Sequence, residues 1–415
     1  MAKPTIRFIG FDDEWEQRKL SELSDFISKG ATPTTYGYDW QESGIPFFRN
    51  DAIKDNQFIY GDFSYISEEA NETLQRSEIH GDDILVAITG DIGKAGIVPK
   101  SIEKGNINQH TARVRIIKDA IPYFVYQSLI TDEQQKKYQL IKTGLSMPQL
   151  SLQQIRDTIV LCPSVEEQSM IGECFINLDH LITLHQRKCD ETKKLKKYML
   201  QKMFPQNGSK VPEIRFKRFT DEWEQRKLGE YLNVSKAKNR DNHYGKEDVL
   251  SVSGDYGIIN QIEFQGRSFA GASVANYGVV NTGDIVYTKS PLSTNPYGII
   301  KANKGKTGIV STLYAVYKPR ENVNPEFVQI YFELNSRMNN YMQPLVNKGA
   351  KNDMKVTAEN ALKGGVCFPK LKEQDVMVDY FKFLDHLITL HQRKCEELKK
   401  LKKFMLQNMF TQKNK

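Results

Sequence analysis

Hydrophobic residues recur every three or four positions through two long segments near the middle and the end of the chain. This spacing predicts two helices whose apolar seams follow a heptad repeat. The first seam consists of Ile171, Cys174, Leu178, Leu181, His185, Lys188, Thr192, Leu195 and Met199. The second consists of Met377, Tyr380, Leu384, Leu387, His391, Lys394, Leu398, Leu401 and Met405. Because both seams are apolar at the ends and polar in the middle, the two helices are predicted to form a coiled coil with each other.

The two helices belong to an internal repeat. Residues 178–206 return as residues 384–412 with 24 of 29 positions identical, and residues 6–23 return as residues 214–231 with 13 of 18 identical. Self-similarity of this kind means that one module is written twice. Each copy has a near-identical opening, a variable interior and a near-identical basic helix, so the interiors can differ in specificity on a common framework.

The interior of the first copy mixes short strands, turns and one helix. Strands are predicted at residues 57–60, 83–89 and 112–117 and at the segment ending at Pro163. Glycine, proline and threonine crowd residues 28–50, and further polar loops are predicted at 89–96, 106–110 and 142–149. Proline at position 122 opens a helix predicted to reach residue 139.

The second copy repeats this plan with different loop residues. A strand is predicted at 284–288, a helix at 325–342, a Gly-Lys loop at 347–354 and a last strand ending at Pro369. In the first copy, Ser164 and Glu167 make a capping box that starts the long helix, while Gly172 is a weak point inside it.

These elements predict an α+β protein with two similar, mixed α/β globular domains. The boundaries are 1–163 for the first domain, 164–204 for its helix, 205–213 for a linker, 214–369 for the second domain and 370–412 for the last helix. The first helix is ~40 to 60 Å long at about 1.5 Å per residue, whereas the linker reaches at most ~28 Å. The helices are therefore expected to run antiparallel as a spacer with approximate two-fold symmetry.

Composition and charge narrow the function classes. The chain has 58 basic and 51 acidic residues, giving a net charge of +7, and seven of the basic residues fall within positions 187–202. No run approaches the ~18 apolar residues of a membrane span, so we expect a cytoplasmic protein. The five cysteines form no CxxC pair and are expected to be reduced.

Candidate contact residues lie in the polar loops, where Lys, Arg, Asn, Gln, Ser and Thr can approach phosphates or base edges beside glycine. Two domains held ~40 to 60 Å apart match one to one and a half turns of B-DNA, given about 34 to 36 Å per turn. The candidates are Lys29, Thr32, Thr34, Arg49, Asn50, Thr89, Lys94, Asn108, Gln109, Lys142 and Ser146 in the first copy, and Lys236, Lys238, Arg240, Ser253, Lys289, Ser290, Asn295, Tyr297, Lys348 and Asn352 in the second.

Several segments carry a resemblance to a known family: the Gly-Thr-Pro loop at 30–33, the TGDIGKAG turn at 89–96, TGLSMPQLS at 143–151, and the P-x-x-x-E-Q junctions that begin at Pro163 and Pro369. With the doubled layout, the whole chain resembles the specificity subunit of type I restriction-modification systems. The second copy departs from these loop patterns. The resemblance implies two target recognition domains, each reading one half of an asymmetric bipartite DNA sequence, with the paired helices as a ruler.

The same resemblance implies partners and places the chemistry in them. Two modification subunits would bind S-adenosylmethionine and methylate adenine, and in the full complex two restriction subunits would use ATP and Mg²⁺ to translocate and cut. This chain is accordingly expected to bind double-stranded DNA, to hold no cofactor or metal and to have no catalytic residues.

Motifs for chemistry within the chain are incomplete. Residues 295–297 resemble part of the NPPY motif of adenine methyltransferases but lack its second proline. Residues 305–307 resemble the end of a P-loop, but Ile300 stands where its first glycine is needed. His180 and His185 are five residues apart and do not share a helix face, so a zinc site is not expected.

Three alternatives stay open on the residues alone. The chain could be a coiled-coil scaffold whose domains bind proteins, an enzyme that combines recognition with catalysis, or a specificity subunit of a related methyltransferase or restriction system without a translocase. The basic run at 193–197 and 399–403 is compatible with a solvated helix face, a docking surface for modification subunits or a track along DNA phosphates.

Overall fold

The protein is described by a computed structural model that covers residues 4–61, 63–144, 146–206, 208–292, 295–348 and 354–410. The chain divides into two compact units, one made of residues 1–186 and 392–415 and the other of residues 187–391. Two long helices, α5 (Val165–Lys202) and α9 (Leu371–Met409), each contribute one half to each unit. A unit is therefore a globular domain together with a stretch of both helices.

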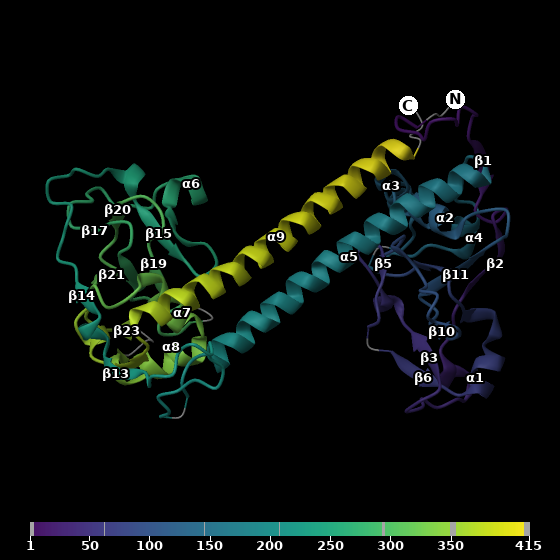
Figure 1. The fold of residues 1–415 in the computed structure, drawn as a ribbon. Coiled ribbons are helices and arrows are strands. Elements are labelled where there is room, and N and C mark those ends of the chain that lie inside the picture. Colours follow the sequence, from purple (N-terminus) through teal and green to yellow (C-terminus); the bar gives the residue numbers. More distant parts are fainter. Residues whose placement is uncertain are drawn as a thin grey trace. The chain divides into compact units, whose positions relative to one another are not determined.

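Unit 1 is built on two four-stranded sheets (Figure 1). The first sheet is antiparallel, with the order β2-β11-β8-β9, and the second has the order β6-β3-β10-β7 with β10 parallel to β3. The strands are β2 (Ser24–Lys29), β3 (Ile45–Phe48), β6 (Ser64–Ile66), β7 (Glu78–Ile79), β8 (Ile84–Ala87), β9 (Ala95–Ile97), β10 (Gly105–Ile107) and β11 (Thr111–Ile116). Smaller pairs are β1 (Glu16–Lys19) with β12 (Ile159–Cys162) and β4 (Ile53–Lys54) with β5 (Gln57–Phe58).

Three helices of unit 1 share the core of the antiparallel sheet with α5: α2 (Pro122–Leu129), α3 (Asp132–Ile141) and α4 (Leu152–Arg156). Helix α1 (Glu68–Thr73) packs on the second sheet instead, through Ala70. The main core combines residues of the sheet with Phe124 of α2, Phe175 of α5 and Met409 of α9. A separate apolar cluster around Phe48 lies between the two sheets.

Unit 2 repeats the antiparallel sheet, with the order β14-β21-β18-β19 (Figure 1). Its strands are β14 (Leu232–Val234), β18 (Ile285–Thr288), β19 (Ile300–Ala302) and β21 (Tyr314–Pro319). The β13 (Glu224–Lys227) and β24 (Gly365–Phe368) pair corresponds to β1 and β12 of unit 1. No second four-stranded sheet is seen in the described part of unit 2, which has further two-stranded pairs: β15 (Leu250–Ser253) with β16 (Gly257–Asn260), β17 (Gly278–Val280) with β20 (Gly308–Val310), and β22 (Asn347–Lys348) with β23 (Met354–Lys355). The helices are α6 (Gln261–Gln265), α7 (Pro325–Glu333) and α8 (Asn335–Met342).

Each predicted domain helix is in fact a pair of helices. Thr131 interrupts the first, because its side chain accepts a hydrogen bond from Gln134 N and caps a new helix. Its hydroxyl also donates to Ser128 O, which ends α2. In unit 2 the break falls at Leu334, between α7 and α8. The prediction of one continuous helix at 122–139 and at 325–342 was therefore wrong, since a local cap ends the first helix in unit 1.

The repeated opening segment, residues 6–23 and 214–231, is hydrogen-bonded to the start of each long helix. Arg7 donates two hydrogen bonds of 2.7 Å to Glu167, and Arg215 donates two of 2.7 Å to Glu373. The glutamine after each glutamate, Gln168 or Gln374, accepts from a backbone N–H at the start of α2 or α7. The P-x-x-x-E-Q junctions thus join three elements of the framework. Ser164 caps Glu167 N as expected, but the Glu167 carboxylate pairs with arginine instead of closing a capping box.

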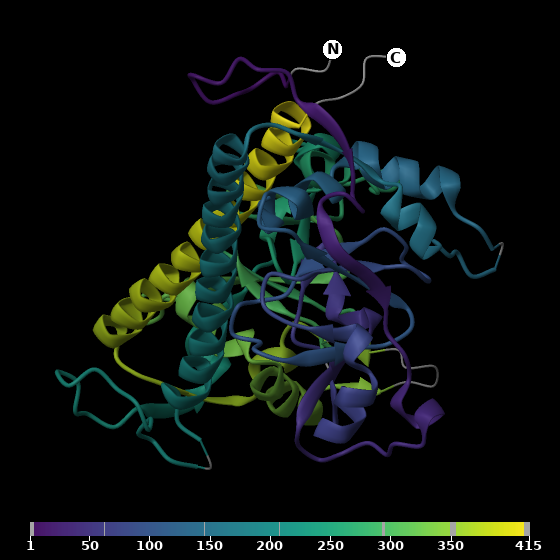
Figure 2. The same ribbon diagram turned by 90° about the vertical axis from the view of Figure 1, so that its right-hand side faces the viewer.

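The two long helices pack side by side and antiparallel within each unit. Figure 1 and Figure 2 show the ribbons of α5 and α9 beside each other within unit 1. The core of this unit places Phe175 of α5 with Met409 of α9, and Cys395 Sγ lies 3.9 Å from Ile182 O. In unit 2, Phe204 packs against Phe381, and Cys189 Sγ lies 4.0 Å from Ile388 O. The prediction that these helices pair is therefore matched by direct contacts in both units.

The residues at the helix contact form two rows, each with a spacing of seven. One row is as predicted, and the other is shifted by one residue. The buried row is Phe175, Ile182, Cys189, Lys196 and Met203, whereas the predicted row was Cys174, Leu181, Lys188 and Leu195. Leu181 and Leu195 are 40% and 42% exposed, and in α9 the equivalent Leu401 is 44% exposed. In a heptad repeat the second row can lie three or four residues after the first, and in α5 it lies four residues after.

Candidate nucleic-acid interface

The loops of unit 1 meet on the side of its antiparallel sheet where strands β2 and β8 end and β11 begins; this side is called the loop edge. Strand β2 ends and β11 begins there, because Ala112 pairs with Lys29, and β8 ends there, because Thr111 pairs with Ala87. The parallel strands β3 and β10 end at the same place, since Ile107 pairs with Phe48 and Asn108 N donates to Phe48 O. Strand ends that share an edge deliver their loops to one surface.

Most of the predicted residues of unit 1 lie on these loops. Thr32 donates from its hydroxyl to Gln109 Oε1 at 2.7 Å, which joins the loop after β2 to the loop after β10. Arg49 and Asn50 directly follow β3. Lys29, Thr34, Arg49 and Gln109 are exposed, and Thr32 and Asn50 are half-buried.

Close backbone packing holds this part of the edge in place. A Cβ added to Gly30 would lie 1.9 Å from Ile107 O, so only glycine allows the loop after β2 to approach β10. Asn108 is 8% exposed, and its Oδ1 accepts from His110 N and from the Thr111 hydroxyl. Asn108 therefore supports the loop from inside, and Gln109 is the neighbour that faces outward.

A second group of loops adjoins the first. Ile88 N donates to His110 O, and Thr89 bridges to Gln149, which also bridges to Thr143. The 142–149 segment thereby lies beside the turn after β8. Lys142 and Ser146 are exposed on this segment, and Lys94 and Thr89 are half-buried.

Unit 2 gathers loops at the equivalent edge of its own sheet. Strand β14 ends there, with Ser235 N donating to Val316 O, and β18 ends there, with Lys289 N donating to Leu313 O. The loop after β14 continues along β17, because Val279 N donates to Ala237 O.

Two lysines lie close together at this edge. Lys236, Lys238 and Arg240 on the loop after β14 are exposed, and Lys289 and Ser290 after β18 are half-buried. The pKa of Lys289 is lowered, first by burial and then by the positive charge of Lys238, while Glu359 opposes the shift. Like charges held together cost free energy unless an anion lies between them, as a DNA phosphate would.

The remaining predicted residues of unit 2 are more scattered. Ser253 ends β15 at a hairpin tip and accepts from Tyr256 N. Asn295 exchanges two backbone hydrogen bonds with Leu292 and begins a turn in which Gly298 N donates to Asn295 O. Tyr297 is 7% exposed in the core, so it supports this turn from within. Lys348 lies in β22, and Asn352 lies outside the described residues.

Sequence reasoning missed the aromatic residues beside the arginine of unit 1. The Arg49 guanidinium lies 5.5 Å from the ring centroid of Trp40, which is 38% exposed, and Tyr36 nearby in the chain is 55% exposed. His110 is a further polar residue of this edge. The signal available in the sequence was the presence of aromatic residues in a loop rich in Gly and Pro, because large apolar side chains at a surface mark binding sites.

The incomplete catalytic motifs also have structural positions. Residues 295–297 form the turn that ends in buried Tyr297. Across the described parts of the chain, no group of three or more His, Cys, Asp or Glu side chains is arranged to hold a metal ion. The same parts include no helix that is long and apolar enough to span a membrane.

Comparison with known proteins identifies the family. The family model for the type I restriction modification DNA specificity domain matches residues 12–194 and again residues 220–400. The chain belongs to this family. Each match includes one loop-bearing domain and most of one long helix, so the family's domain coincides with the internal repeat.

Relatives of this specificity-family chain extend along its whole length. A putative type I restriction enzyme specificity subunit, MjaX, from Methanocaldococcus jannaschii is 22% identical over 96% of this chain and 93% of its own length. The MjaVIII specificity subunit of the same organism is also 22% identical, over 96% of this chain and 92% of its own. The EcoBI specificity subunit of Escherichia coli is 29% identical but over 38% of this chain and 34% of its own.

Solved structures show that the fold is shared as well. The S subunit of a type I restriction-modification system from M. genitalium has a TM-score of 0.62 at 13% identity, covering 99% of this chain and 100% of that one. A chain from a structure on complex assembly and conformational transition of a type I system has a TM-score of 0.50 at 16% identity, with 97% and 99% covered. At sequence identities this low, the comparison shows a shared fold and nothing further.

Proposed function

We propose that this chain is the DNA-reading subunit of a type I restriction-modification complex, in which each unit reads one half of an asymmetric, bipartite, gapped site. The paired helices α5 and α9 act as a coiled-coil spacer with approximate two-fold symmetry and fix the distance between the half-sites. One observation carries the proposal: in both units the variable loops gather at the same edge of an equivalent sheet, on a framework that is nearly identical. That arrangement suits two independent readers.

The reading surface of each unit uses complementary chemistry. Exposed lysines and arginines, such as Arg49 and Lys238, would hold phosphates and position the unit on the duplex. Amide and hydroxyl side chains, such as Gln109 and Ser290, would reach base edges in a groove. Trp40 and Tyr36 add apolar surface beside Arg49.

The helices also supply two equivalent docking surfaces. Leu195 and Tyr198 on α5 are 42% and 47% exposed, and their repeat equivalents on α9, Leu401 and Phe404, are 44% and 53% exposed. Apolar pairs of this size, beside the exposed lysines at 193, 194 and 197 on α5 and at 399, 400 and 403 on α9, fit an apolar helix surface with acidic neighbours. Two similar patches, one on each helix, support two modification subunits, with two restriction subunits joining the full complex.

Under this proposal the chain performs no bond-making step itself. Methylation of adenine with S-adenosylmethionine would reside in the modification subunits, and ATP- and Mg²⁺-dependent translocation and cleavage in the restriction subunits. The chain contributes the choice of site and the geometry in which its partners meet the DNA.

The decisive experiment is to co-express this chain with candidate modification subunits in a methylation-free host and to map modified adenines by single-molecule sequencing. The proposal expects a bipartite, gapped motif. Exchanging residues 21–161 for the same segment of another family member should then change one half of the motif. A change in both halves would refute independent reading.

The competing function is a scaffold whose domains bind proteins. Salt dependence of duplex binding separates the two, because each neutralised phosphate contributes a slope of about −0.9 in log affinity against log salt. A DNA reader with several phosphate contacts loses orders of magnitude in affinity between low and moderate salt. A protein-binding scaffold has no duplex affinity to lose.

A further inference from the structure

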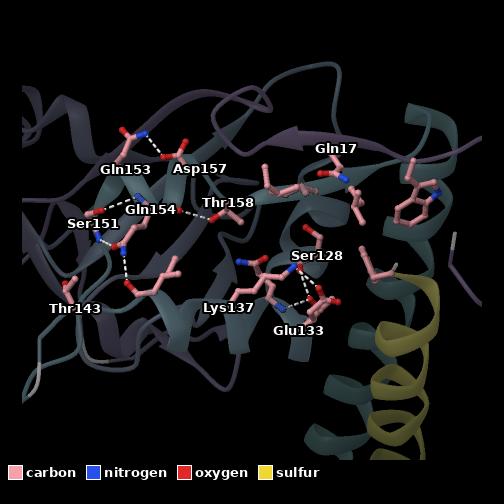
Figure 3. Close-up of a pocket in the computed structure, with 18 residues that line it drawn as sticks. Gln17, Ser128, Glu133, Lys137, Thr143, Ser151, Gln153, Gln154, Asp157 and Thr158 are labelled. Atoms are coloured by element: carbon pink, nitrogen blue, oxygen red, sulfur yellow. Dashed lines mark hydrogen bonds and ion pairs between the residues drawn. The ribbon is translucent and has the colours of Figure 1, made fainter. Parts of the chain in front are cut away.

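A cavity of about 720 Å³ opens in unit 1 between α3, α4, β12 and the end of α9 (Figure 3). The aromatic side chains of Trp15 and Phe410 are part of its lining. Ser128, Glu133 and Lys137 lie together on one side, with Ser151 and Gln154 farther along (Figure 3). The acidic residues that line this cavity are Glu133 in α3 and Asp157 directly after α4.

The same place in unit 2 is filled. Arg337 at the start of α8 lies over two aromatic rings, 4.2 Å from the centroid of Phe204 and 5.0 Å from that of Tyr331. Its guanidinium donates to Tyr331 O at 2.7 Å and to Leu200 O near the end of α5 at 2.6 Å. A planar cation stacked on aromatic faces and bonded to helix carbonyls is a favourable arrangement for arginine.

The cavity of unit 1 and the position of Arg337 in unit 2 are equivalent, because both the sequence alignment and the surrounding contacts match. The α2–α3 and α7–α8 pairs align with an offset of 203, since Gln168 and Gln374 accept from Ile121 N and Asn324 N, respectively. The aromatic cage is also shared. Phe410 lies 5.4 Å from Phe124 and 6.3 Å from Trp15, and Phe204 lies 5.8 Å from Phe327 and 5.9 Å from Trp223, between ring centroids.

Two differences open the cavity. At the positions of Tyr331 and Arg337, unit 1 has Ser128 and Gln134. The Ser128 hydroxyl turns back to Val125 O at 2.6 Å, and Gln134 hydrogen-bonds to the Tyr138 side chain. Unit 1 therefore keeps the aromatic cage and the helix end, but it has a serine and a glutamine where unit 2 has Tyr331 and the stacked Arg337.

We propose that this cavity is a docking pocket for an arginine side chain presented by a partner polypeptide, which takes the position that Arg337 occupies in unit 2. Phe410 supplies the ring face, and Glu133 and Asp157 in the lining attract the cation. Their present partners, Lys137 at 2.7 Å and Lys19 at 2.8 Å, are exposed and contribute little, so an incoming guanidinium can displace them. Arginine fits better than lysine, because a compact ammonium neither stacks on a ring nor forms a planar fork. The proposal is independent of DNA reading.

The test uses the full chain with N-acetyl-L-arginine methylamide as the probe. The chain has three tryptophans, so indole N–H resonances can be assigned by single Trp→Phe variants. We expect a saturable shift of the Trp15 resonance at millimolar probe and no shift of Trp223, whose equivalent place is already filled. The uncharged citrulline analogue and the lysine analogue should bind at least about 5-fold more weakly.

A filled variant provides the matched control. Ser128→Tyr combined with Gln134→Arg rebuilds the unit 2 arrangement within unit 1, so it should fold with an unchanged or higher Tm and abolish the Trp15 shift. The proposal is overturned if the native chain shows no saturable shift, if citrulline binds as well as arginine, or if the filled variant still responds. It is also overturned if binding appears only after residues 411–415 are removed, because the chain's own tail would then be the occupant.

Discussion

Lys402 Nζ lies 2.7 Å from Oδ1 and 2.8 Å from Oδ2 of Asp179, which ties α9 to α5 within unit 1. Tyr123 of α2 also donates to Asp179 Oδ2, at 2.7 Å. The repeat equivalent in unit 2 is Lys196, whose Nζ lies 2.6 Å from Asp385 and 2.6 Å from Glu333. Each unit therefore contains the same ion pair between its two helices, with a link to the domain beside it.

Replacing this lysine should destabilise unit 1. In Lys402→Met the Asp179 carboxylate, on a side chain 16% exposed, loses its cation, and we expect a loss of about 1 to 3 kcal/mol in unfolding free energy, less than for a fully buried pair. Urea denaturation measures the loss. Lys403→Met, an exposed neighbour on the same helix, is the control and should change stability by less than ~0.5 kcal/mol. Equal effects of the two variants would contradict a specific role for the pair.

The bidentate pairs of Arg7 with Glu167 and of Arg215 with Glu373 can be tested by a substitution that keeps the charge. Arg215→Lys keeps the charge but loses one of the two parallel hydrogen bonds to Glu373, so we expect a cost of about 1 to 2 kcal/mol. Arg226→Lys is the control, because Arg226 pairs with exposed Glu224 and such pairs are worth little. Thermal denaturation should show a lower Tm for the first variant and an unchanged Tm for the second.

The pairing of the long helices was predictable from sequence, but the buried row was not. Leucines at 181 and 195 looked like seam residues, whereas the structure buries Ile182 and Lys196. A buried lysine becomes acceptable because its aliphatic stem packs and its ammonium meets two carboxylates. Those carboxylates come from residues 333 and 385, far away in the sequence, so no local pattern could indicate them.

Gly172 shows a second limit of local reasoning. The sequence indicated only a weak point in a helix, with Val378 at the repeat-equivalent position. In the structure a Cβ on Gly172 would lie 3.3 Å from Ile121 Cγ2, so this glycine lets α5 approach α2 closely. The candidate loops were predictable as polar segments, but their meeting at one edge depends on strand register, which becomes visible only in the fold.

The loop edge of unit 1 can be tested with one cation. Arg49→Ala should weaken duplex binding and reduce the magnitude of the salt slope by about 1, as for one lost phosphate contact. Lys118→Ala is the control, because Lys118 is exposed just after the opposite end of β11. Fluorescence anisotropy at several salt concentrations measures both. If the control changes the slope as much as Arg49→Ala, the edge is not the contact surface.

Unit 2 offers the equivalent experiment at its lysine pair. Phosphate binding between Lys238 and Lys289 would relieve their repulsion, so Lys289→Ala should weaken DNA binding by about 1 kcal/mol or more. Without DNA it should leave stability unchanged or slightly higher, since it removes a partly buried charge beside a like charge. Lys318→Ala is the control, because Lys318 is exposed and lies in β21 away from the loop edge. Equal loss of affinity in both variants would argue for non-specific attraction.

The spacer can be tested by changing its length without changing either reading surface. One heptad inserted in both helices, after Gln186 and after His391, keeps each seam in register and adds about 10 Å at 1.5 Å per residue. At about 3.4 Å per base pair, the gap in the methylated motif should grow by about 3 base pairs while both half-sites stay the same. An insertion in one helix alone is the control, because it puts the two seams out of register and should reduce assembly. A gap that stays unchanged after the double insertion would mean that something other than the helix pair sets the distance.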